Sequence, residues 1–550
     1  RLIEAGFKKS FKGKWAATVQ TEDKSKLYKG TIGATEGTEV EGIVQDLNRL
    51  SYNSFISHLR KLNLPMDASA KVTGPRQLHG SQWGVIDPAD SPDGGNIGLQ
   101  KHLAISAYIT KPCSAQPIIR WLREIVYMEL LEECEPKYLH QLTKVFVNGA
   151  WVGALGNPRE VMRLFLLYRR NALIPIYTSG RWDIAHNELQ IFTDGGRLCR
   201  PVFYYDQDKR RPSYARREVI ETLKGGNYAW DQLITGFAKK TVPALDPCRI
   251  YALDELYAGA ADFAALAGSQ SIIEYLDTNE TEGALIAMFP RDVVPGKTTH
   301  VEIHPSLIFG VMGNQIVFPE NNPSSRNNFS CGQGKQAVSL YSSNYMSRID
   351  KMGVVLNYGQ VPLVKSRYMK YINNEQHPYG ENAIVAIMCY NGYNVEDSIL
   401  FNEGSLKRGL FRTTYYNMYE TREEEERTYD KRICNVQAQP TVRGLKPGGD
   451  YSELDRFGLI KENTEMDDKK AVIGRVTEQW ISGSGGISGS GGISGSGDEP
   501  QLEDDSVFPK KGQLGVVDRT FITDEASGRR LAKVRIREER MPGIGDKFCS

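Results

Sequence analysis

The sequence predicts a multidomain α+β protein, and three observations lead to this fold class. Its 550 residues are too many for one hydrophobic core, so several domains are expected. Stretches with a helical pattern at 120–135 and 158–171 are mixed with β-rich stretches at 145–155 and 189–205. Hydrophobic residues make up 40% of the chain and charged residues 25%, which is the balance of ordinary globular domains.

Charge and cysteine usage narrow the class of protein. The 68 basic and 67 acidic residues give a formal net charge of +1, so nucleic-acid contacts must come from local basic patches. Eight cysteines without a C-x-x-C pair predict reduced thiols and no structural zinc in this segment. No apolar run reaches the roughly 18 residues of a membrane span, so we expect no membrane partner. The first residue is arginine, and we expect an internal fragment of a longer chain.

Two segments near the N-terminus have a readable local pattern. Helical spacing of apolar side chains predicts a helix over 44–62 that Asn63 and Pro65 end. Residues 84–98 (GVIDPADSPDGGNIG) are rich in glycine, proline and aspartate, which predicts a loop. Glycine there lets the backbone approach a neighbour closely, although a structural turn explains the glycines equally well.

The stretch from 323 to 401 concentrates residues that suit phosphate and metal chemistry. We expect two loops, joined by apolar runs, to carry Arg326, Lys335, Gln336, Glu396 and Asp397. The run AIVAIMCY at 383–390 is short and rich in β-branched residues, which predicts a buried strand just before the acidic pair. Carboxylates past the end of a strand can reach a divalent cation, and hard oxygen ligands suit magnesium. A solvated loop explains two adjacent carboxylates as well, so the residues alone leave both interpretations open.

Other patterns predict structure more than chemistry. LAKVRIRE at 531–538 alternates apolar and basic residues, which predicts a half-buried strand with one basic face. The acidic run at 423–426 predicts a solvated face. The Gly/Ser repeat at 481–497 predicts a flexible coil, and both an engineered replacement and a natural tether fit it.

Two motifs suggest phosphate or zinc binding, but neither matches the full pattern that such a site requires. PGKTT at 295–299 ends like a phosphate-binding loop, but Arg291 stands where the first glycine belongs. His300, Glu302 and His304 share one strand face and suggest zinc, but their spacing is not that of the helical zinc motif. Hydrogen bonding in a core is the favoured interpretation of these three residues.

Five separated motifs carry a resemblance that covers nearly all of the chain. They are PRQLHGSQWGVIDPADSPDGGNIGLQKHL at 75–103, THVEIHPSLIFGVMGNQIVFPENN at 299–322, SSRNNFSCGQGKQAVSLYSSNY at 324–345, AIVAIMCYNGYNVEDSILFNEGSLKRGLFRT at 383–413 and PGIGDKFCS at 542–550. In this order they resemble the second-largest subunit of multisubunit DNA-directed RNA polymerases of the eukaryotic and archaeal type.

The first of these motifs bears on origin. Its form SPDGGNIGLQKHL departs from the PAETPEG-like pattern of cellular nuclear enzymes and is similar to subunits of large nucleocytoplasmic DNA viruses. We therefore expect a viral origin, with a cellular nuclear polymerase as the alternative. Asp93 stands where the cellular enzymes usually carry glutamate, which leaves its role open.

The resemblance implies a domain order. It consists of a fork, two external domains and a hybrid-binding double-psi β-barrel that a wall or flap domain interrupts. The expected boundaries are 1–110 for the fork and the end of the lobe region, 111–220 and 221–305 for the external domains, 306–413 for the first part of the hybrid-binding domain, 414–505 for the wall insert, and 506–550 for the end of the wall and the truncated second part of the hybrid-binding domain.

The resemblance also implies roles at the active site. Arg326 matches the family arginine that reaches the incoming triphosphate, where a planar bidentate donor fits phosphate oxygens. Lys547 matches a lysine near the RNA 3′ end and the nucleotide. Asp397, with Glu396 beside it, matches the acidic pair near the second magnesium ion, which the nucleotide carries. A salt bridge in a loop for Arg326 and a turn role for Lys547 are the structural alternatives.

Four further residues are implied to contact nucleic acid. Lys335 and Gln336 match residues that lie against the RNA of the DNA–RNA hybrid. Lys71 and Arg76 are candidates for contacts to the DNA backbone near the fork, because phosphate contacts need only positive charge within reach.

The function that the resemblance implies is that of a core subunit of DNA-dependent RNA polymerase. The resemblance implies that such a subunit shares its active site with the largest subunit, whose aspartate triad mainly holds the magnesium. This chain has no D-x-D-x-D motif, so we expect it to be active only with the largest subunit. The implied partners are the largest subunit, smaller core subunits, template DNA, nascent RNA and nucleoside triphosphates. The implied location is the virion and the host cytoplasm or nucleus if viral, and the nucleus if cellular. A non-catalytic scaffold that grips the hybrid is the alternative function.

Overall fold

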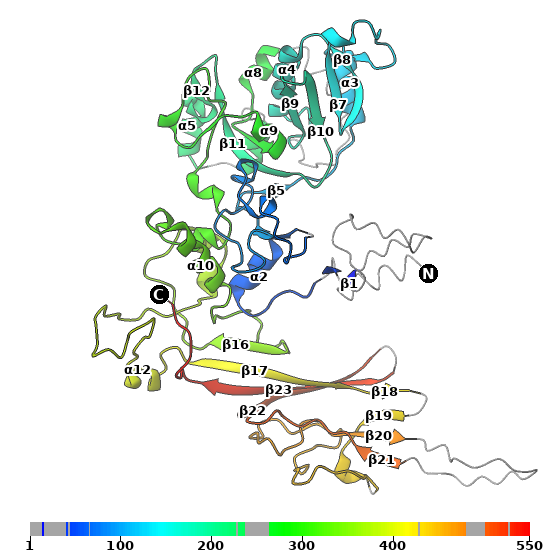
Figure 1. Ribbon diagram of the computed structural model, residues 1–550, viewed down its shortest axis with the longest axis vertical. Coiled ribbons are helices and arrows are strands. Elements are labelled where there is room, and N and C mark those ends of the chain that lie inside the picture. Colours follow the sequence, from blue (N-terminus) through cyan, green and yellow to red (C-terminus); the bar gives the residue numbers. More distant parts are fainter. Residues whose placement is uncertain are drawn as a thin grey trace, which may run out of the picture. The chain divides into compact units, whose positions relative to one another are not determined.

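The computed structural model divides into two compact units (Figure 1). Unit 1 contains residues 43–59 and 333–550, and unit 2 contains residues 60–332, with parts of the first 42 residues assigned to each. The structure describes residues 45–64, 66–226, 229–236, 263–426, 429–439, 441–479, 501–525 and 528–549, together with strands β1 (Lys14–Trp15) and β2 (Val40–Glu41). The Gly/Ser repeat at 481–497, for which we predict a flexible coil, lies outside the described residues.

Unit 2 is built on two β-sheets. The first has the strand order β6 (Glu129–Leu130), β8 (Ala150–Leu155), β7 (Thr143–Val147), β10 (Glu188–Phe192) and β9 (Ser179–Asp183). The second centres on β11 (Leu198–Asp206), which pairs with β12 (Arg211–Pro212), β13 (Ile273–Asp277), β15 (His300–Val301) and β5 (Tyr108–Ile109), and β15 pairs with β14 (Ile286–Ala287). These strands confirm the β-rich stretches predicted at 145–155 and 189–205.

Two helices form the core of unit 2 with the first sheet, namely α3 (Gln116–Glu124) and α4 (Pro158–Arg170). The side chains of Trp121, Phe165 and Tyr168 are buried there among strand residues such as Leu189. Helix α4 begins with proline at its first position and an asparagine cap, which satisfies a backbone N–H of the first turn. It confirms the helix predicted over 158–171.

The helix predicted over 120–135 is wrong beyond residue 124. The backbone turns at Tyr127, whose φ of 57° lies in the left-handed region that a helix cannot continue through. The N–H of Met128 then bonds to the carbonyl oxygen of Leu122 at 2.9 Å, and the chain enters β6. Backbone pairing with β8 therefore overrides the helical spacing of the side chains.

The helix predicted over 44–62 is also wrong in extent. Helix α2 covers only Tyr52–Leu59, and it begins where the Ser54 hydroxyl accepts from the Ser51 N–H at 3.0 Å. The side chains of Leu47 and Leu59 are 42% and 59% exposed, so their spacing does not report a buried face. Residues Lys61–Asn63 form strand β3, which pairs with β4 (Gln100–His102). Val44, where the predicted helix begins, and Pro65, one of the two residues predicted to end it, lie outside the described residues.

The loop predicted at 84–98 is confirmed. It contains no helix or strand, and a single bridge between Ile86 and Leu103 anchors its start. The remaining helices of unit 2 are short: α5 (Arg217–Lys224), α6 (Trp230–Thr235), α8 (Phe263–Gly268) and α9 (Thr278–Glu282). Helix α10 (Ser324–Gly334) crosses the boundary between the units in sequence.

Unit 1 is built on a sheet whose strands come from distant parts of the chain. Its order is β16 (Met352–Leu356), β17 (Thr413–Arg422), β23 (Arg530–Arg540) and β22 (Val516–Asp524). In Figure 1, β17 and β23 run side by side over their length, and they pair antiparallel from Thr413 with Arg540 to Arg422 with Leu531. Strand β23 confirms the strand predicted at 531–538.

A second sheet packs into the same hydrophobic core. It has the order β18 (Glu424–Glu425), β19 (Tyr429–Ile433), β20 (Arg475–Gln479) and β21 (Gln501–Asp504). Val534 and Ile536 of β23 and Ile433 of β19 are fully buried in that core. Unit 1 also contains two short α-helices, α11 (Tyr368–Tyr371) and α12 (Glu403–Lys407).

Two charged residues, one on strand β23 and one between β17 and β18, are less exposed than we expected. Arg535, predicted on the basic face of a half-buried strand, is 2% exposed and pairs with Asp518 at 2.5 Å between Nη2 and Oδ2. Glu423, predicted on a solvated acidic face, is largely buried and pairs with Arg530 at 2.6 Å. Both predictions are wrong at these positions, because a charged side chain that finds an opposite charge and hydrogen bonds can be buried.

The buried strand predicted at 383–390 is wrong. These residues form no strand, and Ile384 and Ile387 are 105% and 100% exposed. A strand needs a neighbour whose backbone groups it can pair with, and β-propensity expresses itself only in that context. Among the described residues, no strand pairs with this segment.

The described residues also bear on membrane insertion. Within them, no helix is long and apolar enough to cross a membrane.

Candidate functional site

Arg326 lies on helix α10 and not on the loop that we expected. The segment SSRNNFSCGQG contains few strong helix formers, so its helix depends on tertiary contacts. One such contact runs from Asn327 Nδ2 to the carbonyl oxygen of Pro319 at 2.9 Å. Arg326 itself is exposed, with its guanidinium 5.6 Å from the centroid of the Phe329 ring, and it forms no ion pair with any described residue.

A second contact joins α10 to the loop at 84–98. Asn328 Nδ2 donates to the carbonyl oxygens of Ala89 at 3.0 Å and of Ser91 at 2.7 Å. Cys331 of the same helix is 1% exposed and packs in a small apolar cluster with Ala89 and Met312. The helix that carries Arg326 is therefore held on this loop by hydrogen bonds and by packing.

The loop has a buried carboxylate at its start. Asp87 accepts from the N–H of Ala89 at 2.9 Å and of Gly310 at 2.7 Å. Burial, and then the nearby carboxylate of Asp90, raise the pKa of Asp87 to about 6, although the two N–H donors oppose the shift. His102 Nδ1 lies 3.4 Å from Asp90 Oδ1, so a histidine faces the second acid.

Arg76 organises the other end of the loop. Its Nη1 donates to the carbonyl oxygens of residues 95 and 97, at 2.7 and 3.0 Å, and its Nη2 to those of residues 68 and 70, at 2.8 and 3.2 Å. Gly98 has φ of 72°, and a Cβ there would lie 2.2 Å from the carbonyl oxygen of Arg76. Lys71 is exposed nearby in sequence. Nucleic-acid contacts by Lys71 and Arg76 stay predictions.

In unit 1, the acidic pair occupies an exposed turn. The N–H of Ser398 bonds to the carbonyl oxygen of Val395 at 3.2 Å, and between them Glu396 and Asp397 have φ of 51° and 66°. Two consecutive left-handed residues that are not glycine are strained by about 1 to 2 kcal/mol each. Asn394 braces the segment by donating to the carbonyl oxygen of Met388 at 2.7 Å. Both residues of the pair are exposed.

A phenylalanine cluster brings Lys547 close to the segment that bears this turn. The ring of Phe548 lies 4.6 Å from that of Phe401 and 5.1 Å from that of Phe411, measured between centroids. Lys547, one residue before Phe548, is exposed and forms no ion pair with a described residue. Two of the motifs that carry the resemblance thus meet within unit 1.

Lys335 and Gln336 follow the end of α10. Lys335 is partly buried, Gln336 is exposed, and the Gln336 N–H bonds to the carbonyl oxygen of Gln333 at 3.0 Å. Asn53 of helix α2 donates from Nδ2 to the carbonyl oxygen of Gly334 at 3.1 Å, which fixes this terminus within unit 1. Their contact with RNA stays a prediction.

The three residues that suggested zinc each have a separate partner. His300 Nε2 lies 2.6 Å from Glu274 Oε1, Arg200 Nη1 donates to Glu302 Oε1 at 2.7 Å, and His304 Nδ1 lies 2.6 Å from the Ser306 hydroxyl. Hydrogen bonding in a core is confirmed for His300 and Glu302. Across the described residues, no group of three or more His, Cys, Asp or Glu side chains is placed to hold a metal ion.

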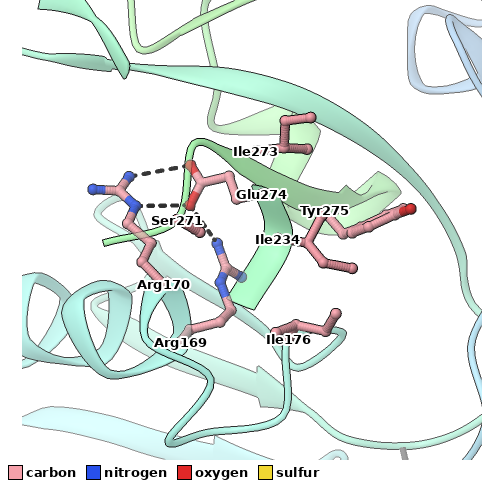
Figure 2. Close-up of a pocket in the computed structure, with 8 residues that line it drawn as sticks. All are labelled: Arg169, Arg170, Ile176, Ile234, Ser271, Ile273, Glu274 and Tyr275. Atoms are coloured by element: carbon pink, nitrogen blue, oxygen red, sulfur yellow. Dashed lines mark hydrogen bonds and ion pairs between the residues drawn. The ribbon is translucent and has the colours of Figure 1, made fainter. Parts of the chain in front are cut away.

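Figure 2 shows a small pocket beside a buried charge cluster in unit 2. Arg169 and Arg170 of α4 both point at Glu274 of β13, with Arg170 Nε 2.9 Å and Arg169 Nη2 3.3 Å from Oε2. Burial raises the pKa of Glu274, but Arg170, His300 and Arg169 outweigh it and hold the pKa well below its ordinary value. The cluster ties α4 to the second sheet.

Sequence reasoning missed Asn328, Asp87 and Phe548. Asn328 offered no signal beyond its place two residues after Arg326. Asp87 was one of three aspartates in the loop predicted at 84–98, and no local pattern distinguished it from the other two. Phe548 is a single aromatic residue next to Lys547, and no local pattern indicates its contacts with Phe401 and Phe411.

Comparisons with known proteins agree on one family. Models of RNA polymerase Rpb2 match as domain 3 at 45–109, domain 4 at 145–206, domain 5 at 266–305 and domain 6 at 312–550. Over 97% of its length, the chain is 35% identical to DNA-directed RNA polymerase II subunit 2 of Arabidopsis thaliana. This chain belongs to the family of second-largest RNA polymerase subunits.

Two further relatives show the breadth of this family. Over 92% of its length, the chain is 33% identical to DNA-directed RNA polymerase II subunit RPB2 of Schizosaccharomyces pombe and 31% identical to DNA-directed RNA polymerase subunit Rpo2 of Saccharolobus shibatae. It spans 42% of the length of each of these three second-largest subunits. The predicted resemblance is confirmed, and the viral origin stays a prediction.

Proposed function

We propose that this chain is part of a core subunit of DNA-dependent RNA polymerase that shares the active site for nucleotidyl transfer and grips the DNA–RNA hybrid. The observation that carries the proposal is the ordered match of four domains of one polymerase subunit from residue 45 to residue 550. The proposed partners are the largest subunit, smaller core subunits, template DNA, nascent RNA and nucleoside triphosphates. The proposed location is the nucleus for a cellular enzyme, and the virion with the host cytoplasm or nucleus for a viral one.

Arg326 is the proposed contact to the triphosphate. An exposed guanidinium without a competing carboxylate keeps its five N–H donors available for phosphate oxygens. Because the helix beneath it is held on loop 84–98, the charge is positioned before the substrate arrives, which is the condition under which such donors stabilise a transition state most.

Lys547 and Asp397 are proposed as a second group of contacts. The phenylalanine cluster supports this proposal, since it joins the segments that carry them. Exposed carboxylate oxygens fit a magnesium ion, but Asp397 and Glu396 alone are too few ligands to hold one. The two carboxylates would therefore complete a site that the largest subunit mainly supplies, where magnesium stabilises the charge of the reacting phosphates.

The fold proposed for unit 1 is a double-psi β-barrel interrupted by a wall domain. The pairing of β17 with both β16 and β23 supports it, because one sheet joins the stretches before and after the insert. The exposed apolar segment at 383–390 supports the presence of a protein partner, since exposed apolar patches commonly mark such contacts.

A single substitution tests the catalytic role against the scaffold alternative. In a polymerase assembled with this subunit, Arg326→Ala is expected to slow single-nucleotide addition. The expected loss of transition-state stabilisation is about 2 to 4 kcal/mol. Binding of the DNA–RNA scaffold should change little. The matched control is Arg291→Ala, because Arg291 is also exposed, at 79%, and lies 4.6 Å from a phenylalanine ring. An unchanged rate of addition would instead make the chain a scaffold.

A further inference from the structure

We propose that Asn328 is a positioning residue that fixes helix α10, and Arg326 with it, on loop 84–98. The inference rests on the proposed contact of Arg326 with the triphosphate. It assigns a specific task to a side chain for which neither the sequence motifs nor the family comparison gives a role.

Both N–H groups of the Asn328 amide are used. Both hydrogens of one Nδ2 go to loop carbonyl oxygens, that of Ala89 at 3.0 Å and that of Ser91 at 2.7 Å. A serine side chain offers one donor and an aspartate none, so only an amide of this length makes both bonds at this distance. Two bonds to residues two apart along the loop resist both sliding and rotation of the helix.

The position of Asn328 on the helix suits an anchor for Arg326. Residues two apart do not share a helix face, so the amide can face the loop while the guanidinium faces solvent. Asn328 is partly buried and Arg326 is exposed, as this geometry requires. Because both side chains belong to one rigid turn, loss of the anchor lets the helix rotate and carries the guanidinium with it.

The loop provides a firm base for this anchor. Asp87 bonds to the N–H of Ala89, the residue whose carbonyl oxygen receives Asn328, and to the N–H of Gly310. A Cβ at Gly310 would lie 2.7 Å from the carbonyl oxygen of Leu103, so the backbones are in close contact there. The helix by itself is weak, since serine, asparagine and glycine dominate it.

The test is a double-mutant cycle in a polymerase assembled with this subunit. Asn328→Asp keeps the size of the side chain and removes both donors, and it is combined with Arg326→Ala. Single-nucleotide addition is measured at saturating and limiting nucleotide. We expect Asn328→Asp to lower kcat by roughly 10-fold to 100-fold, the scale of a small misplacement of a reacting group, with a smaller change in KM. In the Arg326→Ala background, the same substitution should have almost no further effect.

Each outcome separates this inference from the proposed function. If Arg326→Ala alone leaves the rate unchanged, the proposed role of Arg326 fails and the inference fails with it. If Arg326→Ala slows addition but Asn328→Asp does not, or if the two effects multiply, only the positioning role is overturned. Ser330→Ala, an exposed position on the same helix, serves as the control. Should Asn328→Asp not assemble, Asn328→Ser, which keeps one donor, is carried through the same cycle.

Discussion

In unit 2, Arg326 stands on a helix that paired hydrogen bonds hold to a loop, and the loop is itself fixed by Asp87 and Arg76. In unit 1, Glu396 and Asp397 lie on a turn within the segment from 382 to 400. Every residue of this segment is exposed except the partly buried Asn394. Both regions carry candidate residues of the same proposed reaction. They differ in how much of their surroundings this chain supplies.

The comparison shows where preorganisation comes from. Around Arg326, the folded chain provides the donors, acceptors and packing that set the position of the charge. The free-energy cost of positioning the guanidinium is therefore part of folding and does not arise during the reaction. Around the acidic pair, the chain provides a strained turn and exposed apolar side chains. The first region should therefore respond to small internal changes, and the second should tolerate them.

The largest expected difference is in the stability cost of an alanine substitution at two glycines with positive φ. Gly98, at φ of 72°, has no room for a Cβ, whereas Gly392, at φ of 77°, faces open space. Gly98→Ala should cost about 3 to 4 kcal/mol in local stability, from a clash with backbone added to left-handed strain. Gly392→Ala should cost only the strain, about 1 to 2 kcal/mol. Hydrogen exchange of peptides covering 84–98 and 388–398 measures each change in its own region.

Equal costs at the two glycines would break the comparison. They would mean that the segment around Gly392 is packed as tightly as the loop. A small cost at Gly98 would mean that the loop shifts away from Arg76 without loss, and then the loop could not serve as a firm base.

A smaller difference concerns pH. The pKa of Asp87 is raised to about 6 in the folded chain from its ordinary 3.8, so the folded state binds the proton more tightly than the unfolded state. Its contribution to stability is therefore greatest at low pH and falls as the pH rises from about 4 to about 6, by about 3 kcal/mol in all. The side chains of Asp90 and His102 also face this site. Hydrogen exchange of 84–98 should show weaker protection at pH 7 than at pH 5, by about 1 kcal/mol.

Two asparagine variants isolate that effect. Asp87→Asn should abolish the loss of protection between pH 5 and pH 7, because no charge remains to be buried. Asp93→Asn, an exposed acid on the same loop, should keep the wild-type pH dependence. A pH dependence that survives Asp87→Asn would assign it to Asp90 or His102.

Particular residues show what the sequence could predict. Composition predicted the loop at 84–98, and periodicity predicted the helix at 158–171 and the strand at 531–538, because these signals are local. The anchor by Asn328 joins residues 239 and 237 positions apart, and no local pattern reports such a contact. The run at 383–390 has strand propensity without a strand partner, so propensity alone gave the wrong structure. Arg326 was found by its motif, while the helix beneath it was not.

The smallest expected effect lies in the turn of unit 1, where Glu396 has φ of 51°. Glu396→Gly removes the left-handed strain of about 1 to 2 kcal/mol, and the greater freedom of glycine in the unfolded chain takes back about half. The net gain of roughly 0.5 to 1 kcal/mol should slow amide exchange at Ser398, whose N–H closes the turn, by about twofold to fivefold. Glu396→Gln, which removes the charge and keeps the strain, should leave the exchange rate unchanged. If Gln slows exchange as much as Gly does, repulsion between the neighbouring carboxylates strains this turn more than its backbone does.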